Sequence, residues 1–194
     1  MAARHKVFVS YHHANDENYK NIFNLKFGNK HDILVRGSVE LGDIDPNVQT
    51  ETIRRTIRDN YLRDTSVTVV LVGTQTWQRK HVDWEISSSI RNTAANPRSG
   101  LLGILLPSFM QAYGHSVRTD SLGNVLAYDP FVVPPRLHDN VACGYARLYT
   151  WTEDPEVLAG RLHEAYLAKH RILVEPNNAR TLFARNRSGD RWTD

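Results

Sequence analysis

The chain has little of what marks several large protein classes. Its 194 residues include one cysteine, Cys143, so it cannot form an internal disulfide, and a disulfide-stapled scaffold is excluded. The longest apolar runs, at residues 67–72 and 101–106, are far shorter than the roughly 20 residues of a membrane-spanning helix, and the first ten residues have no signal-peptide pattern. We therefore expect a cytoplasmic protein with no membrane partner.

An excess of charge of one sign is also missing. The chain has 24 Lys and Arg against 21 Asp and Glu, and its arginines are scattered, with no basic stripe that alternates with aromatic residues. This distribution gives little support to a nucleic-acid partner. Because 41% of the residues are hydrophobic, the composition is that of an ordinary globular domain.

The short motifs of the commonest nucleotide and hydrolase sites are absent as well. There is no G-x-G-x-x-G sequence, no Walker A loop, no G-x-S-x-G elbow and no paired C-x-x-C. His12, His13 and Asp16 are close in sequence, but adjacent histidines point apart. We therefore interpret residues 11–16 as a polar loop and predict no metal site.

What the sequence does contain is an alternation of apolar or β-rich runs with amphipathic segments. The runs predict strands at residues 6–10, 31–35, 66–73, 101–106 and 146–151. Helices are predicted at 19–25, at 48–62, around Val82, Ile86 and Ile90, and from Asp154-Pro155 onward, with a turn-rich loop at 42–46. This order predicts a three-layer α/β domain with a central parallel sheet.

Two segments depart from this alternation. Residues 107–145 are rich in proline, with scattered Gly, Asn and Asp, and predict a long, mostly irregular insertion. Residues 172–194 hold four arginines and show little periodicity, so we expect a C-terminal tail after a domain that spans residues 1–171.

Glu85 is the most informative single residue. It lies in the helix that directly follows the strand at 66–73, at the carboxyl edge of the predicted sheet, where open α/β folds bind ligands. His81, Ser88 and Ser89 share its helical stripe. The spacing alone leaves two interpretations open, namely a carboxylate that complements the helix dipole and a functional group at the ligand-binding edge.

Several of these segments resemble one family. The run Val7-Phe8-Val9-Ser10-Tyr11 resembles the opening of TIR domains, and residues 65–73 followed by 79–86 are similar to the TIR-like family that includes ThsB of the bacterial Thoeris antiphage system. The resemblance extends over about residues 6–171, including 129–131 and 148–151. It implies a flavodoxin-like domain of the bacterial cytoplasm, an NAD-cleaving site and a catalytic glutamate, which is Glu85 here.

The resemblance also implies which residues contact NAD. Ser10 and Tyr11 end the first strand, and His12 and His13 stand where NAD-cleaving relatives often carry basic residues. We expect these histidines to contact the NAD diphosphate, more strongly below the histidine pKa of about 6.5. Many catalytic TIR domains carry tryptophan four residues before the glutamate. This chain has His81 there, with Trp84 nearby, and we expect both to take part in binding.

One carboxylate is enough for the implied chemistry. Cleavage of the nicotinamide–ribose bond passes through an oxocarbenium-like state, and nicotinamide leaves as a neutral molecule without an acid. NAD is thus a substrate and no cofactor is expected. Capture by water gives ADP-ribose, capture within the same molecule gives a cyclic or glycocyclic product, and an outside nucleophile gives a conjugate.

The family resemblance favours a cyclic, ADP-ribose-derived signal that diffuses to a separate effector protein in antiphage defence. A phage-derived trigger and self-assembly are the further partners that it suggests. Two alternatives stay open, namely a non-catalytic TIR-like protein-interaction module and a nucleotide-binding sensor without turnover.

Overall fold

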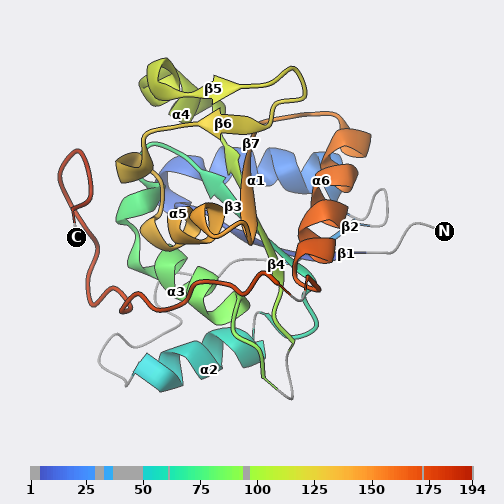
Figure 1. Ribbon diagram of the computed structural model, residues 1–194, viewed down its shortest axis with the longest axis vertical. Coiled ribbons are helices and arrows are strands. Elements are labelled where there is room, and N and C mark those ends of the chain that lie inside the picture. Colours follow the sequence, from blue (N-terminus) through green and yellow to red (C-terminus); the bar gives the residue numbers. More distant parts are fainter. Residues whose placement is uncertain are drawn as a thin grey trace.

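The computed structural model describes residues 5–28, 33–36, 50–60, 62–93, 97–171 and 173–193. A central parallel sheet is covered by helices on both faces (Figure 1). Its five strands are β1 (His5–Ser10), β2 (Ile33–Arg36), β3 (Val67–Val72), β4 (Gly100–Leu105) and β7 (Ala146–Thr150), in the order β2-β1-β3-β4-β7. The predicted α/β, flavodoxin-like class is therefore confirmed.

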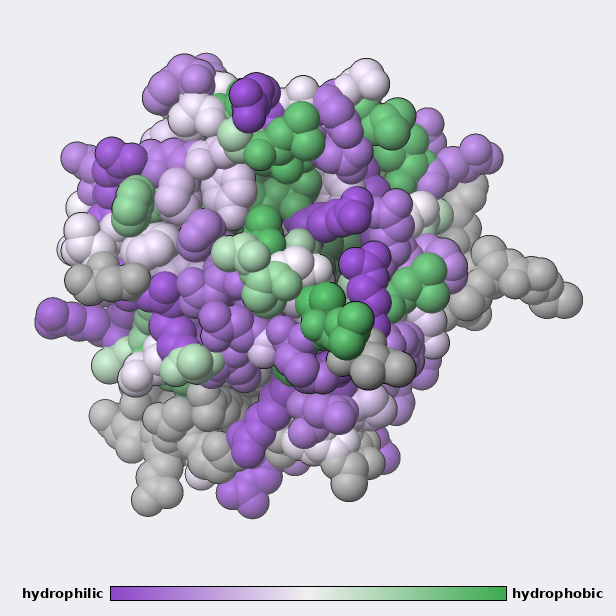
Figure 2. All heavy atoms as spheres, in the orientation of Figure 1, coloured by the Kyte–Doolittle hydropathy of each residue, from purple (hydrophilic) through white to green (hydrophobic). Residues whose placement is uncertain are grey.

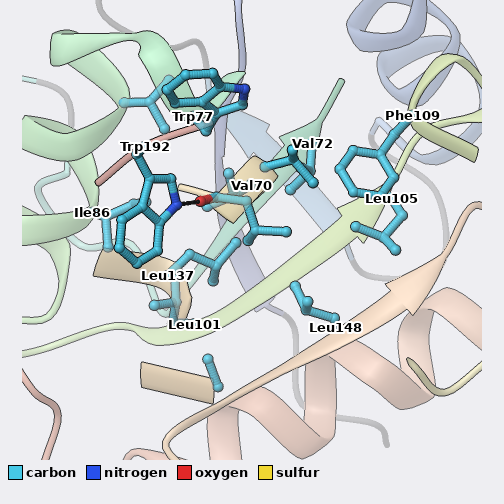
Figure 3. Close-up of a cluster of buried hydrophobic side chains, with 14 of the residues drawn as sticks. Val70, Val72, Trp77, Ile86, Leu101, Leu105, Phe109, Leu137, Leu148 and Trp192 are labelled. Atoms are coloured by element: carbon cyan, nitrogen blue, oxygen red, sulfur yellow. Dashed lines mark hydrogen bonds between the residues drawn. The ribbon is translucent and has the colours of Figure 1, made fainter. Parts of the chain in front are cut away.

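The helices complete the two outer layers. They are α1 (His13–Phe27), α2 (Thr50–Asn60), α3 (Lys80–Ser89), α4 (Pro107–Tyr113), α5 (Pro135–Ala142) and α6 (Pro155–Ala168). Val69 packs in a cluster with Phe23 of α1 and Leu158 of α6, whereas Val70 packs in a second cluster with α3 and α5 (Figure 3). Because successive strand residues point to opposite faces, the valines and the leucine of β3 supply both clusters.

A polar segment turns out to begin a helix. Residues 11–16 were expected to form a loop, and this is wrong for 13–16, because α1 begins at His13. The backbone N–H groups of Asn15 and Asp16 donate to the carbonyl of His12, which closes the first turn. Polar and acidic residues are favourable in a first helical turn, so a polar run alone did not separate a loop from a helix start. The loop expected at 42–46 lies outside the described residues.

The segment 107–145 is more regular than expected. It holds α4, α5 and an antiparallel hairpin of β5 (Arg118–Thr119) and β6 (Val125–Ala127), so the prediction of a mostly irregular insertion is wrong. Pro107 and Pro135 each begin a helix, where the missing N–H of proline is not needed. In Figure 1 the hairpin lies beyond the carboxyl ends of the strands, and a bridge from Asn124 to Tyr149 ties it to β7.

The C-terminal residues 173–193 contain no helix or strand, yet they run along α5 and α3 (Figure 1). Phe183 and Trp192 are buried, and Trp192 enters the cluster between the sheet, α3 and α5 (Figure 3). This tail is therefore packed against the domain.

The surface shows no extended apolar face in the view of Figure 2, where apolar side chains form separate patches between hydrophilic ones. Among the described residues, no helix combines the length and the hydrophobicity that a membrane span requires.

Candidate active site

Glu85 on α3 contacts the last residue of β1. The hydroxyl of Ser10 donates a hydrogen bond to Glu85 Oε2, and both residues are fully buried. The strand order reverses between β1 and β3, and open α/β sheets bind ligands at the carboxyl ends of the strands at such a reversal. The structure thus brings two of the residues selected from the sequence together at the expected edge of the sheet.

The surroundings of Glu85 separate the two interpretations of this residue. Residues 81–89 of α3 are all buried, although many of them are polar. Glu85 is the sixth residue of the helix, and the helix dipole acts mainly on the first turn. A fully buried carboxylate is costly unless it is paired, so its position is poorly explained by a dipole effect alone.

His81 lies one helical turn before Glu85 and joins α3 to the loop after β1. Its Nε2 is 3.0 Å from the carbonyl oxygen of Tyr11, and since a carbonyl only accepts, this nitrogen carries the proton. Burial lowers the pKa of His81 to about 4. The ring of His13 stacks on Tyr11 with centroids 4.4 Å apart and meets His81 edge-on at 5.2 Å, so the three rings form one aromatic cluster.

The electrostatics of His12 correct one expectation. Its side chain is buried, and Nδ1 has no hydrogen-bond partner within the described part of the chain. Burial is the main reason that the pKa of His12 falls to about 4, and Arg79, His81 and His13 lower it further. The prediction that His12 gains charge near pH 6.5 is therefore wrong. At neutral pH it offers an uncharged imidazole that can donate one hydrogen bond.

Trp84 has a different environment from that of Glu85. Its indole Nε1 donates to the carbonyl of Phe183 at 2.8 Å, and its ring packs in a cluster with Phe8, Ile57 and Leu62. Neighbouring residues on a helix do not face each other, so Trp84 points toward α2 and the tail while Glu85 points toward Ser10. The hydrogen bond and the packing of Trp84 therefore join α3 to the tail and to α2.

Asp16 is a buried carboxyl group at the same sheet edge, and the sequence singled it out only as a metal ligand. It accepts a hydrogen bond from Thr76 Oγ1 at 3.2 Å, and burial raises its pKa to about 6. A Cβ on Gly73 would lie 2.3 Å from each Asp16 oxygen, so glycine permits this close approach. Within the described residues, no group of three or more His, Cys, Asp or Glu could hold a metal ion.

A large hollow of the described structure lies elsewhere. It has a volume of about 730 Å³ and is lined by residues of the C-terminal tail together with Trp77. Neither Ser10 nor Glu85 lines it, and Glu85 has no exposed surface in this conformation. The polar contact between Ser10 and Glu85 therefore indicates the candidate site, and this hollow does not coincide with it.

Comparison with known families links this geometry to one group of proteins. Residues 8–110 match the family model described as Thoeris protein ThsB, TIR-like domain. The match covers more than half of the chain and contains both Ser10 and Glu85. No curated protein matches the chain.

Proposed function

This chain belongs to the TIR-like domain family of the Thoeris protein ThsB, and we propose that it is an antiphage-defence enzyme that cleaves NAD at the nicotinamide–ribose bond. The observation that carries the proposal is the hydrogen bond from Ser10 to the fully buried Glu85 at the carboxyl edge of the sheet. A preorganised carboxylate at this edge is the group that the reaction needs.

In the proposed mechanism, Glu85 stabilises the positive charge that develops on the ribose. The bond between ribose C1′ and the nicotinamide nitrogen breaks, its electron pair leaves with nicotinamide, and nicotinamide departs neutral. The carboxylate acts more strongly in a buried site than in water because the local dielectric is low. Ser10 holds Oε2 in place during this step.

Substrate recognition is proposed for the residues beside this pair. Tyr11, His13 and His81 form an aromatic cluster against which a planar nicotinamide ring could stack. His12 is proposed to donate a neutral hydrogen bond to the diphosphate. Because Glu85 is covered in this conformation, NAD reaches it only after its neighbours have moved.

The family match supports a proposal about the product. Capture of the cleaved ribose by water gives free ADP-ribose, whereas capture by an atom of the same molecule gives a cyclic nucleotide. Because the match is to a Thoeris family, we prefer a cyclic, ADP-ribose-derived nucleotide that can serve as a signal. The nucleotide is proposed to diffuse to a separate effector protein, and a phage-derived trigger and self-assembly are proposed as controls.

The catalytic step is tested with purified protein by measuring nicotinamide release from NAD. Glu85→Gln keeps the shape of the side chain and removes its charge, and we expect at least about a hundredfold loss of rate. Glu17→Gln, at an exposed position on α1, is the matched control and should keep the parent rate. If Glu85→Gln releases nicotinamide at the parent rate with an unchanged melting temperature, Glu85 is not the catalytic residue.

The diffusible signal is tested by transfer. A protein-free filtrate of infected cells that express the chain should activate the effector protein in vitro, whereas a filtrate of Glu85→Gln cells should not. If both filtrates are inert and the effector responds only to the intact protein, the chain signals by contact and the alternative of an interaction module is correct.

A further inference from the structure

The C-terminal strap, residues 173–193, lies outside the family match and runs along the helix that carries Glu85 (Figure 1). It has no regular structure of its own, so its course is set by the groups to which it binds. Many of these groups belong to α3 or to the turn just before it.

The strap supplies the N-terminal cap that α3 lacks. Arg79 stands at the N-cap position and makes no side-chain cap hydrogen bond. Asn186 Oδ1 instead accepts from the backbone N–H of Lys80 at 2.9 Å. Beside this contact, the backbone N–H of Arg187 donates to the carbonyl of Gln78 at 2.8 Å. A residue far along the chain thus completes the first turn of the helix.

The strap also holds α3 on either side of Glu85. The backbone N–H of Phe183 donates to Asp83 Oδ2 at 3.0 Å, and the Phe183 carbonyl accepts from Trp84 Nε1 at 2.8 Å. Near the end of the helix, Asn178 Nδ2 donates to the carbonyl of Ser87 at 3.0 Å. The strap therefore contacts the beginning, the middle and the end of α3.

The strap is itself fixed by elements other than α3. Trp192 is buried in the cluster of Figure 3. Its Nε1 donates to the carbonyls of Pro130 and Val133 at 2.9 and 2.8 Å. Arg180 binds both oxygens of Asp139 on α5, at 2.8 and 3.1 Å. Because these hydrogen bonds go to residues outside α3, the strap can hold the helix in a fixed position.

We propose that the C-terminal strap is a clamp that sets the position of α3, and that Asn186 is a positioning residue for Glu85. This inference rests on the proposed catalytic function of Glu85. Loss of the Asn186 cap frees the first turn of α3. His81 and Glu85 then lose their alignment with Tyr11 and Ser10, which lowers the rate of the chemical step more than the binding of NAD.

Asn186 is exposed, so its replacement should leave the fold intact. We expect Asn186→Ala to lower kcat for nicotinamide release by about fivefold with KM unchanged within twofold. Asn186→Asp keeps an oxygen acceptor next to the helix N-terminus and should restore kcat to within twofold of the parent value. Arg185→Ala, at the neighbouring exposed position, is the control and should behave as the parent protein.

Amide hydrogen exchange reports the clamp without any substrate. In Asn186→Ala, the amides in the first turn of α3 should exchange about fivefold faster, while those of α6 remain unchanged. This measurement tests whether the strap holds α3 even if the parent protein does not cleave NAD. A lack of NAD cleavage would contradict the proposed function and not the clamp. Unchanged exchange in α3, or a kcat loss that Asn186→Asp does not restore, would overturn the proposal.

Discussion

At the residue scale, the hydroxyl of Ser10 joins β1 to the carboxylate of Glu85 on α3 without any exposed surface on either residue. Buried polar groups keep one arrangement when their partners are present, and they become costly when a partner is removed. The contribution of Ser10 to function should therefore be measurable separately from its contribution to stability.

Ser10→Ala is expected to lower nicotinamide release by about tenfold, because the carboxylate loses a hydrogen-bond donor that helps to orient it. It should also lower the free energy of unfolding by about 1 to 2 kcal/mol. Ser66→Ala is the matched control, since its hydroxyl accepts from the Lys6 N–H at the opposite end of β1. If Ser10→Ala and Ser66→Ala lose similar unfolding free energy and also lose the same fraction of the nicotinamide-release rate, Ser10 has no specific role in catalysis.

Asp16 gives a prediction for the pH dependence of stability. Burial raises its pKa from 3.8 to about 6, so the folded state holds this proton more tightly than the unfolded state. The stabilisation is present below about pH 4 and is lost as the pH rises through 6, by up to about 3 kcal/mol. Asp16→Asn removes this titration. The unfolding free energy of the variant relative to that of the parent should therefore be higher at pH 8 than at pH 4.

The measurement for Asp16 is urea unfolding of both proteins at the two pH values, with the exposed Asp190→Asn as control. From pH 4 to pH 8, the unfolding free energy of Asp16→Asn relative to that of the parent should rise by about 1 to 3 kcal/mol. A difference that is the same at both pH values would mean that Asp16 titrates normally in the folded protein.

The residues of the site differed in how well the sequence predicted them. Ser10 and Glu85 could be selected because strand ends and helix stripes are local patterns, and a resemblance pointed to the same positions. The direction in which the Trp84 side chain points could not be predicted from the sequence, because it depends on the packing of α2 and the tail. The low pKa of His12 also depends on burial by distant residues, which no spacing reveals.

At the element scale, local end signals worked best where a cap and a proline occur together. Asp154-Pro155 predicted the start of α6, and Asp154 Oδ1 accepts from the backbone N–H groups of Glu156 and Val157 at 2.8 and 3.3 Å. In the segment 107–145, prolines were interpreted as breakers, although Pro107 and Pro135 begin helices. Proline marks a boundary, and the residues after it decide whether a helix follows.

The cap of α6 is expected to matter for stability and not for turnover. Asp154→Ala removes both accepted hydrogen bonds and should cost about 1 kcal/mol of unfolding free energy, whereas Asp154→Ser should recover most of it. Nicotinamide release should stay at the parent rate in both variants, because α6 packs on the opposite face of the sheet from α3. A loss of turnover at unchanged stability would show that α6 contributes to the site.

At the scale of the whole molecule, α3, α5 and the strap meet at Arg136, which has no exposed surface. Its Nε and Nη2 bind the two carboxylate oxygens of Asp83 at 2.8 and 3.3 Å, and Nη1 donates to Asn178 at 2.7 Å. Nη2 also donates to the carbonyl of Arg180 at 2.8 Å. These contacts join residues 42 to 53 positions apart, and no local sequence pattern could have predicted them.

Arg136→Met should therefore be one of the most destabilising single changes in the chain. It leaves the Asp83 carboxylate buried without its guanidinium, and the expected loss of unfolding free energy is about 3 to 5 kcal/mol. Adding Asp83→Asn removes the stranded charge, so the double variant should lose less than the sum of the two single variants, by about 1 to 3 kcal/mol. Urea unfolding of all four proteins measures this coupling. If the losses simply add, the Arg136–Asp83 pair is not an energetic unit, and α3 is held by the strap contacts and by its apolar packing on the sheet and α5.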